Sequence, residues 1–547
     1  MKSGIQKELI EIIKKALGDL KLDVFLSAGQ EPELVLASAF GDLSSNIALR
    51  LASAVKKPPK VIADDIVREA QKHLQQADFK GYVSQIRVEG AGFINFYLSP
   101  EYFYEVLSSI SGQKWDYTDI KSGGNGLPVM IEFVSANPTG ALSVAHARQA
   151  AVGDALANIF LFLGYKAHKE YYLNDEGNQI NILGESIRAR LKQLNGEKVD
   201  FPENYYQGDY ITDMARRIKE EKLDIKDFSE YGADAILDVI RQELKDFRVE
   251  FDCWYSQKAL TKRGDIEKTF AFLREKGFLY KKEGAVWFRS TDFGDDKDRV
   301  VIKSDGSYTY LAPDIAYHWS KYLRGFKLLV NLLGPDHHGY ISRLKASVSA
   351  LGYEPDSLNV VIVQLASIFR DGKPVEMSTR KGQYITLREV LEEVGCDASR
   401  FFFLMRKTSS HLAFDLETAK KQTPENPVYY VQYAHARISS ILRQAAKAVQ
   451  PEGVDMSFLK EKEELDLIRK LWQFPYVLKV CAKTFDPYML TVYLQEAAEG
   501  FHRFYDRHRV LGQDEGLTRA RLALISAVNV TLAAGLKLAG VSAPEQM

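Results

Sequence analysis

The sequence predicts an α/β protein. Its centre would be a Rossmann-like, doubly wound parallel-sheet domain with an insertion, preceded by a small N-terminal α/β domain and followed by a C-terminal α-helical bundle. Three observations support this class: mixed helical and short strand patterns over residues 1–115, strand-loop-helix alternation over 120–420, and only helical patterns over 421–547. We take these three ranges as the expected domains.

Composition narrows the functional classes. The 547 residues, 46% of them hydrophobic, are enough for several cores. The 72 Lys and Arg residues balance 73 Asp and Glu residues, so any nucleic-acid role must come from local patches. The three cysteines form no C-x-x-C pair, which argues against a disulfide framework and against a protein-bound zinc ion.

Two apolar stretches bear on cellular location. Charges interrupt the apolar positions of residues 1–20, as in an amphipathic helix, and no h-region of a signal peptide is present. The stretch 522–540 contains Asn529, Thr531 and Lys537, which indicates a buried helix rather than a membrane span. We expect a soluble, cytoplasmic protein without membrane association.

The elements of the central region follow in order. A strand at 127–134 leads through a short polar loop into a long helix, and a second strand at 326–333 leads through Gly-Pro-Asp-His-His-Gly into another. Ligands of such sheets bind at the carboxyl ends of the strands. The charged sequence of about residues 190–285, which has helical periodicity, predicts an insertion. Further on, Asp305-Gly306 between alternating runs predicts a hairpin with a type I′ turn.

The stretch IEFVSANPTGALSVAH, residues 131–146, predicts a phosphate site. A strand ending at Val134, a tight turn at 137–140 and a helix beginning near Leu142 leave free N–H groups at the positive end of a helix dipole. His146, in the first helical turn, adds a donor suited to a phosphoryl group that changes geometry. The alternative is that His146 only caps the helix or packs in the core.

A second candidate lies at residues 374–382, PVEMSTRKG. Arg380 and Lys381 on a short loop could close over a triphosphate and neutralise it as pyrophosphate departs. Taken alone, the same residues could equally form a solvated charged turn.

Together these stretches resemble the nucleotide-binding motifs of class I aminoacyl-tRNA synthetases. Ser143–His146 stands where that class has His-Ile-Gly-His, and Met377–Lys381 resembles its Lys-Met-Ser-Lys-Ser loop. The runs EFVSANPTG, YTYLAPDIAY, GPDHHGYISRLKA, MSTRKG and YYVQYAHARI resemble arginyl-tRNA synthetases, and the likeness extends over nearly the whole chain. The resemblance implies ATP-dependent ligation of L-arginine to tRNA(Arg), with Mg²⁺ on the phosphates.

A guanidinium ion is planar and permanently charged, so its pocket should offer carboxylates and an aromatic wall. Glu132 fits because a carboxylate in an apolar strand is costly unless it is paired. Asp314 fits too, although it could instead N-cap the helix that begins near it. The expected arginine contacts are Glu132, Ser135, Asn137, Tyr310, Asp314 and Asp336.

The resemblance also implies the nucleotide contacts and the catalytic groups. The expected ATP contacts are Pro138, Thr139, Gly140, Ser143, His146, His337, His338, Met377, Ser378 and Thr379, and the expected catalytic residues are His146, Ser143, Arg380 and Lys381. Ser143 replaces the usual first histidine and Thr379 the usual lysine, so Arg380 or Lys381 must supply the cation. Asp336-His337-His338 is interpreted as a substrate contact rather than a metal site, since adjacent histidines do not easily share an ion.

Two basic and aromatic stretches are candidates for RNA contact. Tyr430, Tyr433 and Arg437 fall on one helical face, and Arg503 and Arg507 lie among aromatic residues. A tyrosine stripe at this spacing could equally be core. The resemblance implies that the bundle binds the anticodon and that residues 1–115 touch the outer corner of the tRNA.

We expect a monomer. Two other classes stay open: a non-catalytic RNA-binding relative, and a related enzyme that activates another amino acid or a small acid.

Overall fold

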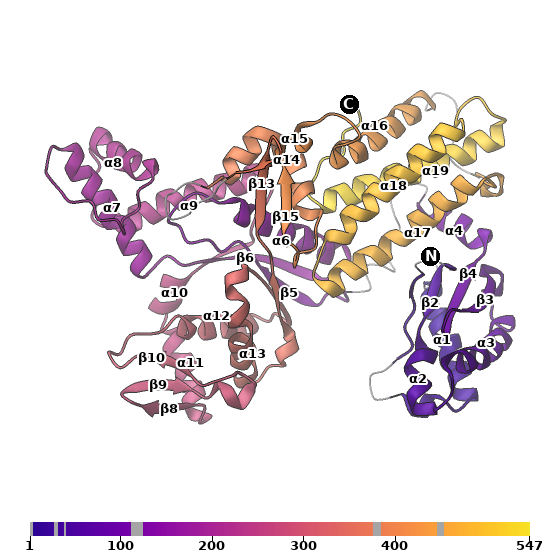
Figure 1. Cartoon of the computed structure of the whole chain (residues 1–547), viewed down its shortest axis with the longest axis horizontal. Coiled ribbons are helices and arrows are strands. Elements are labelled where there is room, and N and C mark those ends of the chain that lie inside the picture. The colour runs from indigo at the N-terminus through magenta and orange to yellow at the C-terminus, as the bar shows by residue number, and fades with distance from the viewer. Residues whose placement is uncertain (1–3, 27–30, 38–39, 111–123, 376–383, 446–452) are drawn as a thin grey trace.

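The computed structural model describes residues 4–26, 31–37, 40–110, 124–375, 384–445 and 453–547. Figure 1 shows the N-terminal unit beside the long C-terminal helices, with the central sheet and two projecting units on the opposite side. Three regions therefore follow one another along the chain, as expected: an α/β unit, an α/β unit with a parallel sheet, and an all-helical unit.

The N-terminal unit is an antiparallel sheet covered by helices. Its strand order is β1-β2-β4-β3, and α1, which packs on α3, buries Leu9, Ile12, Ile13 and Ala16 at helical spacing. The elements are α1 (Ile5–Asp19), β1 (Val35–Leu36), β2 (Leu43–Ser45), α2 (Ile47–Val55), α3 (Pro59–Gln75), β3 (Val83–Glu89), β4 (Phe93–Leu98) and α4 (Pro100–Ile110). Helix α4 reaches the C-terminal helices, where the Tyr104 hydroxyl donates to the Leu459 carbonyl at 2.7 Å.

The central sheet has five parallel strands in the order β12-β11-β5-β6-β7. The first strand in sequence, β5, lies in the middle, so the chain winds first to one side and later to the other. This confirms the doubly wound prediction and puts the switch point between β5 and β11. The strands are β5 (Pro128–Glu132), β6 (Lys166–Leu173), β7 (Cys253–Ser256), β11 (Leu328–Leu333) and β12 (Leu358–Ile362).

Helix α6 (Val144–Phe162) follows β5 and is buried on nearly all sides. It packs between the sheet and later helices, and Gly153 allows close contact, since a Cβ there would lie 2.2 Å from the Phe133 ring. Helices α12 (Leu311–Leu323) and α13 (Ile341–Ala350) flank β11 in sequence. They bring residues from the later half of the sheet to the same edge as the start of α6.

The single insertion expected at about 190–285 is divided into two segments, because β7 pairs in parallel with β6 and belongs to the sheet. The first segment holds α7 (Asn178–Leu194), α8 (Asp209–Glu221) and α9 (Phe228–Asp246). The second holds α10 (Gln257–Lys262), α11 (Asp265–Glu275), β8 (Leu279–Lys282), β9 (Ala285–Phe288) and β10 (Arg299–Ile302). A strand of 4 residues between charged helices carries too short an apolar pattern to be recognised.

The predicted type I′ turn at Asp305-Gly306 is wrong in type. The Lys303 N–H donates to the Ser307 carbonyl at 2.8 Å, which closes the loop. Gly306 has φ 86°, whereas Asp305 is not among the residues with positive φ. A type I′ turn needs positive φ at both central residues, and here only Gly306 of the two meets that condition.

Helices dominate the rest of the chain. A small sheet of β13 (Ala366–Arg370), β14 (Lys373–Pro374) and β15 (Leu412–Asp415) precedes the bundle. The helices are α14 (Leu387–Leu404), α15 (Leu416–Lys420), α16 (Pro427–Ala445), α17 (Lys462–Thr484), α18 (Tyr488–Arg507) and α19 (Glu515–Leu538). By length and composition α19 could cross a membrane, but 61% of its most apolar window is buried against its neighbours. The prediction of a buried helix there is confirmed.

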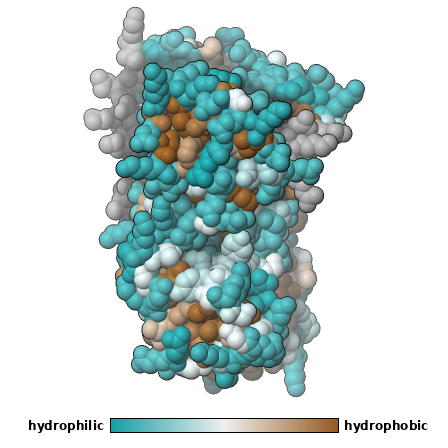
Figure 2. All heavy atoms as spheres, turned by 90° about the vertical axis from the view of Figure 1, so that its left-hand side faces the viewer, coloured by the Kyte–Doolittle hydropathy of each residue, from teal (hydrophilic) through white to brown (hydrophobic). Residues whose placement is uncertain are grey.

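The two units that project from the sheet present a mainly hydrophilic surface. Figure 2 shows the face on their side of the molecule, with hydrophobic residues gathered in an upper and a lower patch. A broad hydrophilic band separates the patches, so this face has no continuous apolar area of the kind that marks a permanent interface.

Candidate active site

A cavity of about 610 Å³ opens at the carboxyl ends of β5 and β11, beside the switch point of the sheet. Ligands of doubly wound sheets bind at this position. Residues from separate parts of the chain line it, and eight of the expected contacts are among them: Glu132, Ser135, Asn137, His146, Tyr310, Asp314, Asp336 and His337.

The chain leaves β5 through an unusual backbone. The strand ends at Glu132, two residues before the predicted end at Val134. Val134 and Ser135 have φ 66° and 41°, in the left-handed region. A β-branched residue held there costs on the order of 1–3 kcal/mol. Such strain persists at functional sites where surrounding contacts hold it, and here it turns the chain towards the start of α6.

His146 both caps α6 and lines the cavity. Its Nδ1 accepts a hydrogen bond from the Ser143 backbone N–H at 3.2 Å, as the alternative interpretation of this residue required. Burial lowers its pKa to about 4, so the ring is neutral at pH 7. Since Nδ1 accepts, the remaining hydrogen is on Nε2. Capping therefore orients the ring as a neutral donor at the edge of the cavity.

Glu132 is paired with a cation of the protein itself. Only 6% of the residue is exposed, and the Lys321 ammonium forms an ion pair with its Oε2. Lys321, on α12, also donates to Asn331 Oδ1 at 3.1 Å. A buried carboxylate must be paired, and the partner comes from 189 positions away in the sequence. The other oxygen, Oε1, lies 3.5 Å from the Ser135 hydroxyl.

Asp314 lies inside the first turn of α12, which begins at Leu311, so it does not act as the N-cap. The Tyr340 hydroxyl donates to its Oδ2 at 2.5 Å. The pKa of this carboxyl is raised to about 6, chiefly by burial and also by the nearby charge of Glu132, while the Tyr340 hydroxyl and Lys321 lower it. Within the described parts of the chain, no lysine or arginine side chain lies within ion-pairing distance of Asp314.

His318 connects the two acidic residues. Its Nδ1 donates to the Asp314 carbonyl at 2.8 Å, and its Nε2 accepts from the Asn331 amide at 2.9 Å. Burial, together with Lys321, lowers the pKa of His318 to about 3, so the ring is neutral. Asn331 in turn accepts from Lys321. A continuous polar network therefore runs beneath the cavity from Asp314 to Glu132.

Three further expected contacts lie at the rim. Tyr310 is 83% exposed, and the Asp336 side chain is 80% exposed and lies 3.4 Å from His337. All three line the cavity. His338 is exposed and lies outside the lining. The structure therefore separates His338 from the two residues before it.

Several lining residues were not among the expected contacts. They are Gln149, Tyr172, Asn174, Tyr317, His318, Asn331 and Tyr340. Gln149 is one helical turn after His146, and Asn331 interrupts an apolar strand just as Glu132 does. The helical spacing of Gln149 from His146 and the polar Asn331 in an apolar strand could have identified these two residues. The tyrosines could not be identified in this way, because tyrosine is common in protein cores.

The turn expected to bind phosphate lies beside the cavity and does not line it. The Thr139 carbonyl accepts from the Tyr210 hydroxyl at 2.6 Å, and the Ala141 carbonyl accepts from the Tyr384 hydroxyl at 3.1 Å. Of the turn and helix start, Pro138, Thr139, Gly140 and Ser143 are outside the lining. Ser143 instead forms a backbone bridge with Thr386.

The second motif falls outside the described residues, which stop at Val375 and resume at Tyr384. This applies to Met377, Ser378, Thr379, Arg380 and Lys381. The described residues on either side of the motif are hydrogen-bonded to the rest of the domain. The Val375 N–H donates to the Ile368 carbonyl at 2.9 Å, and the Leu387 N–H donates to the Leu142 carbonyl at 2.7 Å. The chain that follows the motif is thus hydrogen-bonded to the start of α6.

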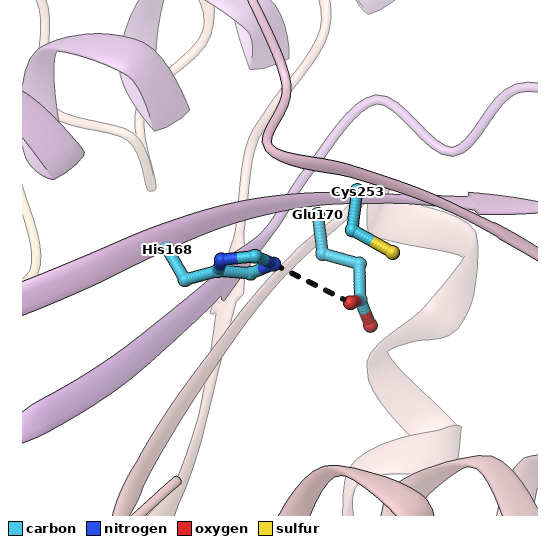
Figure 3. Close-up of side chains that lie close together, drawn as sticks. All are labelled: His168, Glu170 and Cys253. Carbon is cyan, nitrogen blue, oxygen red and sulfur yellow. Dashed lines mark ion pairs between the residues drawn. The ribbon is translucent and has the colours of Figure 1, made fainter. Parts of the chain in front are cut away.

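One cluster resembles a metal site. His168, Glu170 and Cys253 bring a nitrogen, a carboxylate and a thiol within 4.8 Å of one another on β6 and β7 (Figure 3). Glu170, however, accepts from Arg324 at 2.5 and 2.9 Å and from Tyr317 at 2.7 Å. Burial raises the pKa of the Cys253 thiol to about 11, which keeps it protonated. The guanidinium already supplies the cation that Glu170 needs.

The two stretches expected to contact RNA meet between α16 and α18. The Tyr430 ring lies 4.6 Å from the His502 ring, and the Arg437 guanidinium lies 4.5 Å from the centre of Tyr505. Tyr430, Tyr433 and Arg437 are half-buried. Arg503 and Arg507 are exposed but form ion pairs with Glu499 and Glu463 on the bundle itself. The tyrosine stripe is therefore partly core and partly surface.

Three family models match successive parts of the chain. The arginyl tRNA synthetase N terminal domain matches residues 7–98, the catalytic domain of class I tRNA synthetases (R) matches 107–439, and the DALR anticodon binding domain matches 431–547. The second of these alone covers more than half of the chain.

Individual relatives match over nearly the full length. An arginine–tRNA ligase of Desulfosudis oleivorans is 46% identical over 542 residues, which cover 95% of this chain and 96% of that protein. An arginine–tRNA ligase of Geobacillus thermodenitrificans is 46% identical over 563 residues, covering 99% of both chains. The solved structure of Thermus thermophilus arginyl-tRNA synthetase has a TM-score of 0.77 at 21% identity, covering 100% of both chains, a likeness of fold.

Proposed function

The chain belongs to the arginyl-tRNA synthetase family, and we propose that the cavity between β5 and β11 is where it activates L-arginine with ATP for transfer to tRNA(Arg). One observation carries the assignment of the cavity. Two carboxylates, the buried Glu132 and the half-buried Asp314, face it, and among the described residues Lys321 forms an ion pair with Glu132 while no lysine or arginine forms one with Asp314. One further cation is needed to balance the charge, and a guanidinium supplies it.

In this proposal, arginine binds with its guanidinium towards Asp314, because Glu132 is already paired with Lys321. Asp314 receives the guanidinium, with Tyr310 as a wall and Asp336 at the rim. Glu132 Oε1, with Ser135 and Asn137, receives the α-amino and carboxyl groups. The Asn137 amide donates to Gln179 at 2.6 Å, which orients its own oxygen for a substrate donor.

The nucleotide lies on the other side, at the start of α6. The Nε2–H of His146 donates to a phosphate oxygen, and Pro138–Gly140 and Ser143 approach through the backbone. We propose His337, His338, Met377, Ser378 and Thr379 as further nucleotide contacts. Arg380 or Lys381 supplies a further cation.

The reaction follows from this placement. The arginine carboxylate attacks the α-phosphorus in line, arginyl adenylate forms and pyrophosphate leaves. The 2′-hydroxyl of the terminal adenosine of tRNA then attacks the acyl carbon, and AMP leaves. His146 stabilises the charge on the phosphoryl group as a fixed neutral donor. Mg²⁺ would supply additional positive charge to the phosphates.

We also propose how the tRNA is held. The surface between α16 and α18 offers Tyr430, Tyr433 and Arg437 to unpaired anticodon bases, and Arg503 and Arg507 exchange their internal ion pairs for phosphates. Residues 1–115 contact the outer corner of the tRNA and residues 421–547 its anticodon. We further propose that the enzyme is a cytoplasmic monomer that activates arginine only with tRNA bound.

The test is pyrophosphate release with tRNA(Arg), ATP and each of the twenty amino acids. Arginine alone should give a strong signal, because a pocket with unpaired negative charge rejects neutral side chains. Asp314→Asn should raise KM for arginine by about 10- to 100-fold, as expected for a charge-assisted contact of about 1.5–3 kcal/mol. Glu250→Gln, an exposed acid outside the cavity, is the matched control. Release with another amino acid, or equal effects of both variants, contradicts the assignment.

A further inference from the structure

Arg148 is a fully buried cation that the proposed reaction does not use. It lies on α6 two residues after His146, and 0% of it is exposed. Burial lowers its pKa to about 10, so it is still protonated at pH 7. The hydrogen bonds of its guanidinium go to backbone carbonyl oxygens. A buried charge is costly unless it serves several acceptors at once.

The carbonyls belong to two loops. The Nη1 group donates to Gln364 at 2.7 Å and to Ser410 at 2.9 Å, and Nη2 donates to Lys407 at 3.0 Å. Gln364 follows β12, and its neighbour Leu365 lines the cavity that His146 also lines. Residues 405–411 connect α14 to β15. One side chain thus ties the cavity wall to this loop and to the helix of His146.

The same loop contacts the C-terminal helices. The Thr408 N–H and hydroxyl donate to Asp486 Oδ2 at 2.9 and 3.2 Å, and Asp486 lies in the corner between α17 and α18. The Thr408 carbonyl accepts from the Gln364 N–H at 2.9 Å. The corner of the bundle is therefore two contacts away from the cavity wall.

We infer that Arg148 is a positioning residue that sets the cavity wall beside His146, and that the Thr408–Asp486 contact couples this wall to the seating of the C-terminal helices. The inference rests on the proposed function, since it concerns the same cavity. When tRNA binds the bundle, a displacement of the α17–α18 corner reaches the wall through the 405–411 loop. A planar guanidinium with five donors can serve both loops, whereas the point charge of lysine has three donors and reaches one.

The first test is Arg148→Lys, with kcat and KM measured in aminoacylation at saturating tRNA and arginine affinity measured by calorimetry. A displaced wall should lower kcat by about 10- to 100-fold, as small misplacements of reacting groups do, with arginine affinity unchanged. Arg521→Lys is the matched control, a buried arginine that donates to Glu464 within the bundle. It should lower the unfolding temperature without lowering kcat. Wild-type kcat in Arg148→Lys, or equal kcat losses in the two variants, overturns the inference.

The second test addresses the coupling. Asp486→Ala should lower kcat in the wild-type background and have no further effect in Arg148→Lys, because both act on one loop. Additive effects overturn the coupling. Should Arg148→Lys fail to fold, Asp486→Ala decides by itself: it removes both hydrogen bonds from Thr408 and leaves every hydrogen bond of Arg148 in place, and an unchanged kcat overturns the coupling. Failure of the proposed function is distinct, since the wild-type protein would then release no pyrophosphate with arginine.

Discussion

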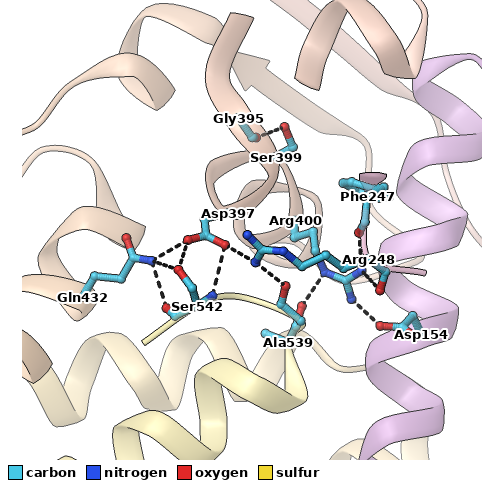
Figure 4. Close-up of polar contacts among 11 residues, drawn as sticks. Asp154, Phe247, Arg248, Gly395, Asp397, Ser399, Arg400, Gln432, Ala539 and Ser542 are labelled. Carbon is cyan, nitrogen blue, oxygen red and sulfur yellow. Dashed lines mark hydrogen bonds and ion pairs between the residues drawn. The ribbon is translucent and has the colours of Figure 1, made fainter. Parts of the chain in front are cut away.

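The Arg400 guanidinium donates to Asp154 Oδ2 at 2.5 Å in the interior, where both residues are almost completely buried. The same side chain donates to the carbonyls of Ala539 and Phe247, each at 2.9 Å (Figure 4). Asp154 is on α6, Arg400 on α14, Phe247 at the end of α9 and Ala539 at the end of α19. The Arg400 side chain therefore joins the end of α19 to the helix of His146, through one hydrogen bond and one ion pair.

Replacing Arg400 should destabilise the protein strongly. Arg400→Met leaves Asp154 buried with Lys169 at 3.0 Å as its remaining cation, so the expected loss is about 3 kcal/mol, the lower end for a broken buried pair. Urea denaturation measures it. Arg188→Met, which breaks an exposed pair with Glu185, should cost under about 1 kcal/mol. Equal losses of unfolding free energy in the two variants would show that the buried pair stabilises the protein no more than the exposed pair does.

The chain after α19 depends on Gly540. Its φ is 70°, and a Cβ there would lie 2.2 Å from the Arg400 guanidinium. Gly540→Ala should therefore cost about 1–3 kcal/mol more than backbone strain alone. Gly512→Ala is the matched control, because its φ is 79° but a Cβ would meet nothing within 4 Å. Denaturation curves of both variants give the difference, and a difference near zero would mean that Arg400 moves aside freely.

Arginine affinity should depend on the ionisation of Asp314. Burial raises its pKa to about 6, so affinity should fall by about tenfold per pH unit below that value, since the neutral acid cannot pair with a guanidinium. The Tyr340 hydroxyl favours the ionised form. Tyr340→Phe should therefore move the midpoint to higher pH, measured by calorimetry of arginine binding. Tyr353→Phe, whose ring stacks on Tyr322, should leave the midpoint in place, and an equal shift in it would refute this explanation.

His146 should act as a neutral donor. With a pKa of about 4 it stays unprotonated above pH 6, so it should add no inflection to the pH profile of pyrophosphate exchange between pH 6 and 8. His146→Ala removes the donor and should lower the exchange rate by about 10²–10³-fold, as loss of a preorganised donor does. Ser143→Ala should reduce transition-state stabilisation by only about 0.5–1.5 kcal/mol, because the Ser143 hydroxyl makes a neutral hydrogen bond with His146 Nδ1. An inflection near pH 7 that His146→Ala abolishes would contradict the neutral assignment.

Part of the site could be recognised from residue patterns alone. Glu132, Asp314 and His146 stand out because each places a polar group in an apolar segment, at a strand end or at a helix start. Tyr340 and Lys321 carry no such signal, since a tyrosine and a lysine in amphipathic helical text are ordinary. The partner of Glu132 could not be identified from the sequence for this reason: Lys321 lies on a helix whose position depends on the packing of the sheet.

The sequence by itself determined the class of the fold and the family, because hydrophobic periodicity and short motifs are local properties of the chain. It also singled out Glu132 at the end of β5 and Asp314 at the start of α12, both of which line the cavity. Tertiary structure alone decided that β7 divides the insertion, that Lys321 neutralises Glu132, and that Arg148 and Arg400 join loops and helices distant in sequence. Those outcomes depend on which buried groups meet when the helices close on the sheet, and each buried charge must then find partners wherever the packing provides them.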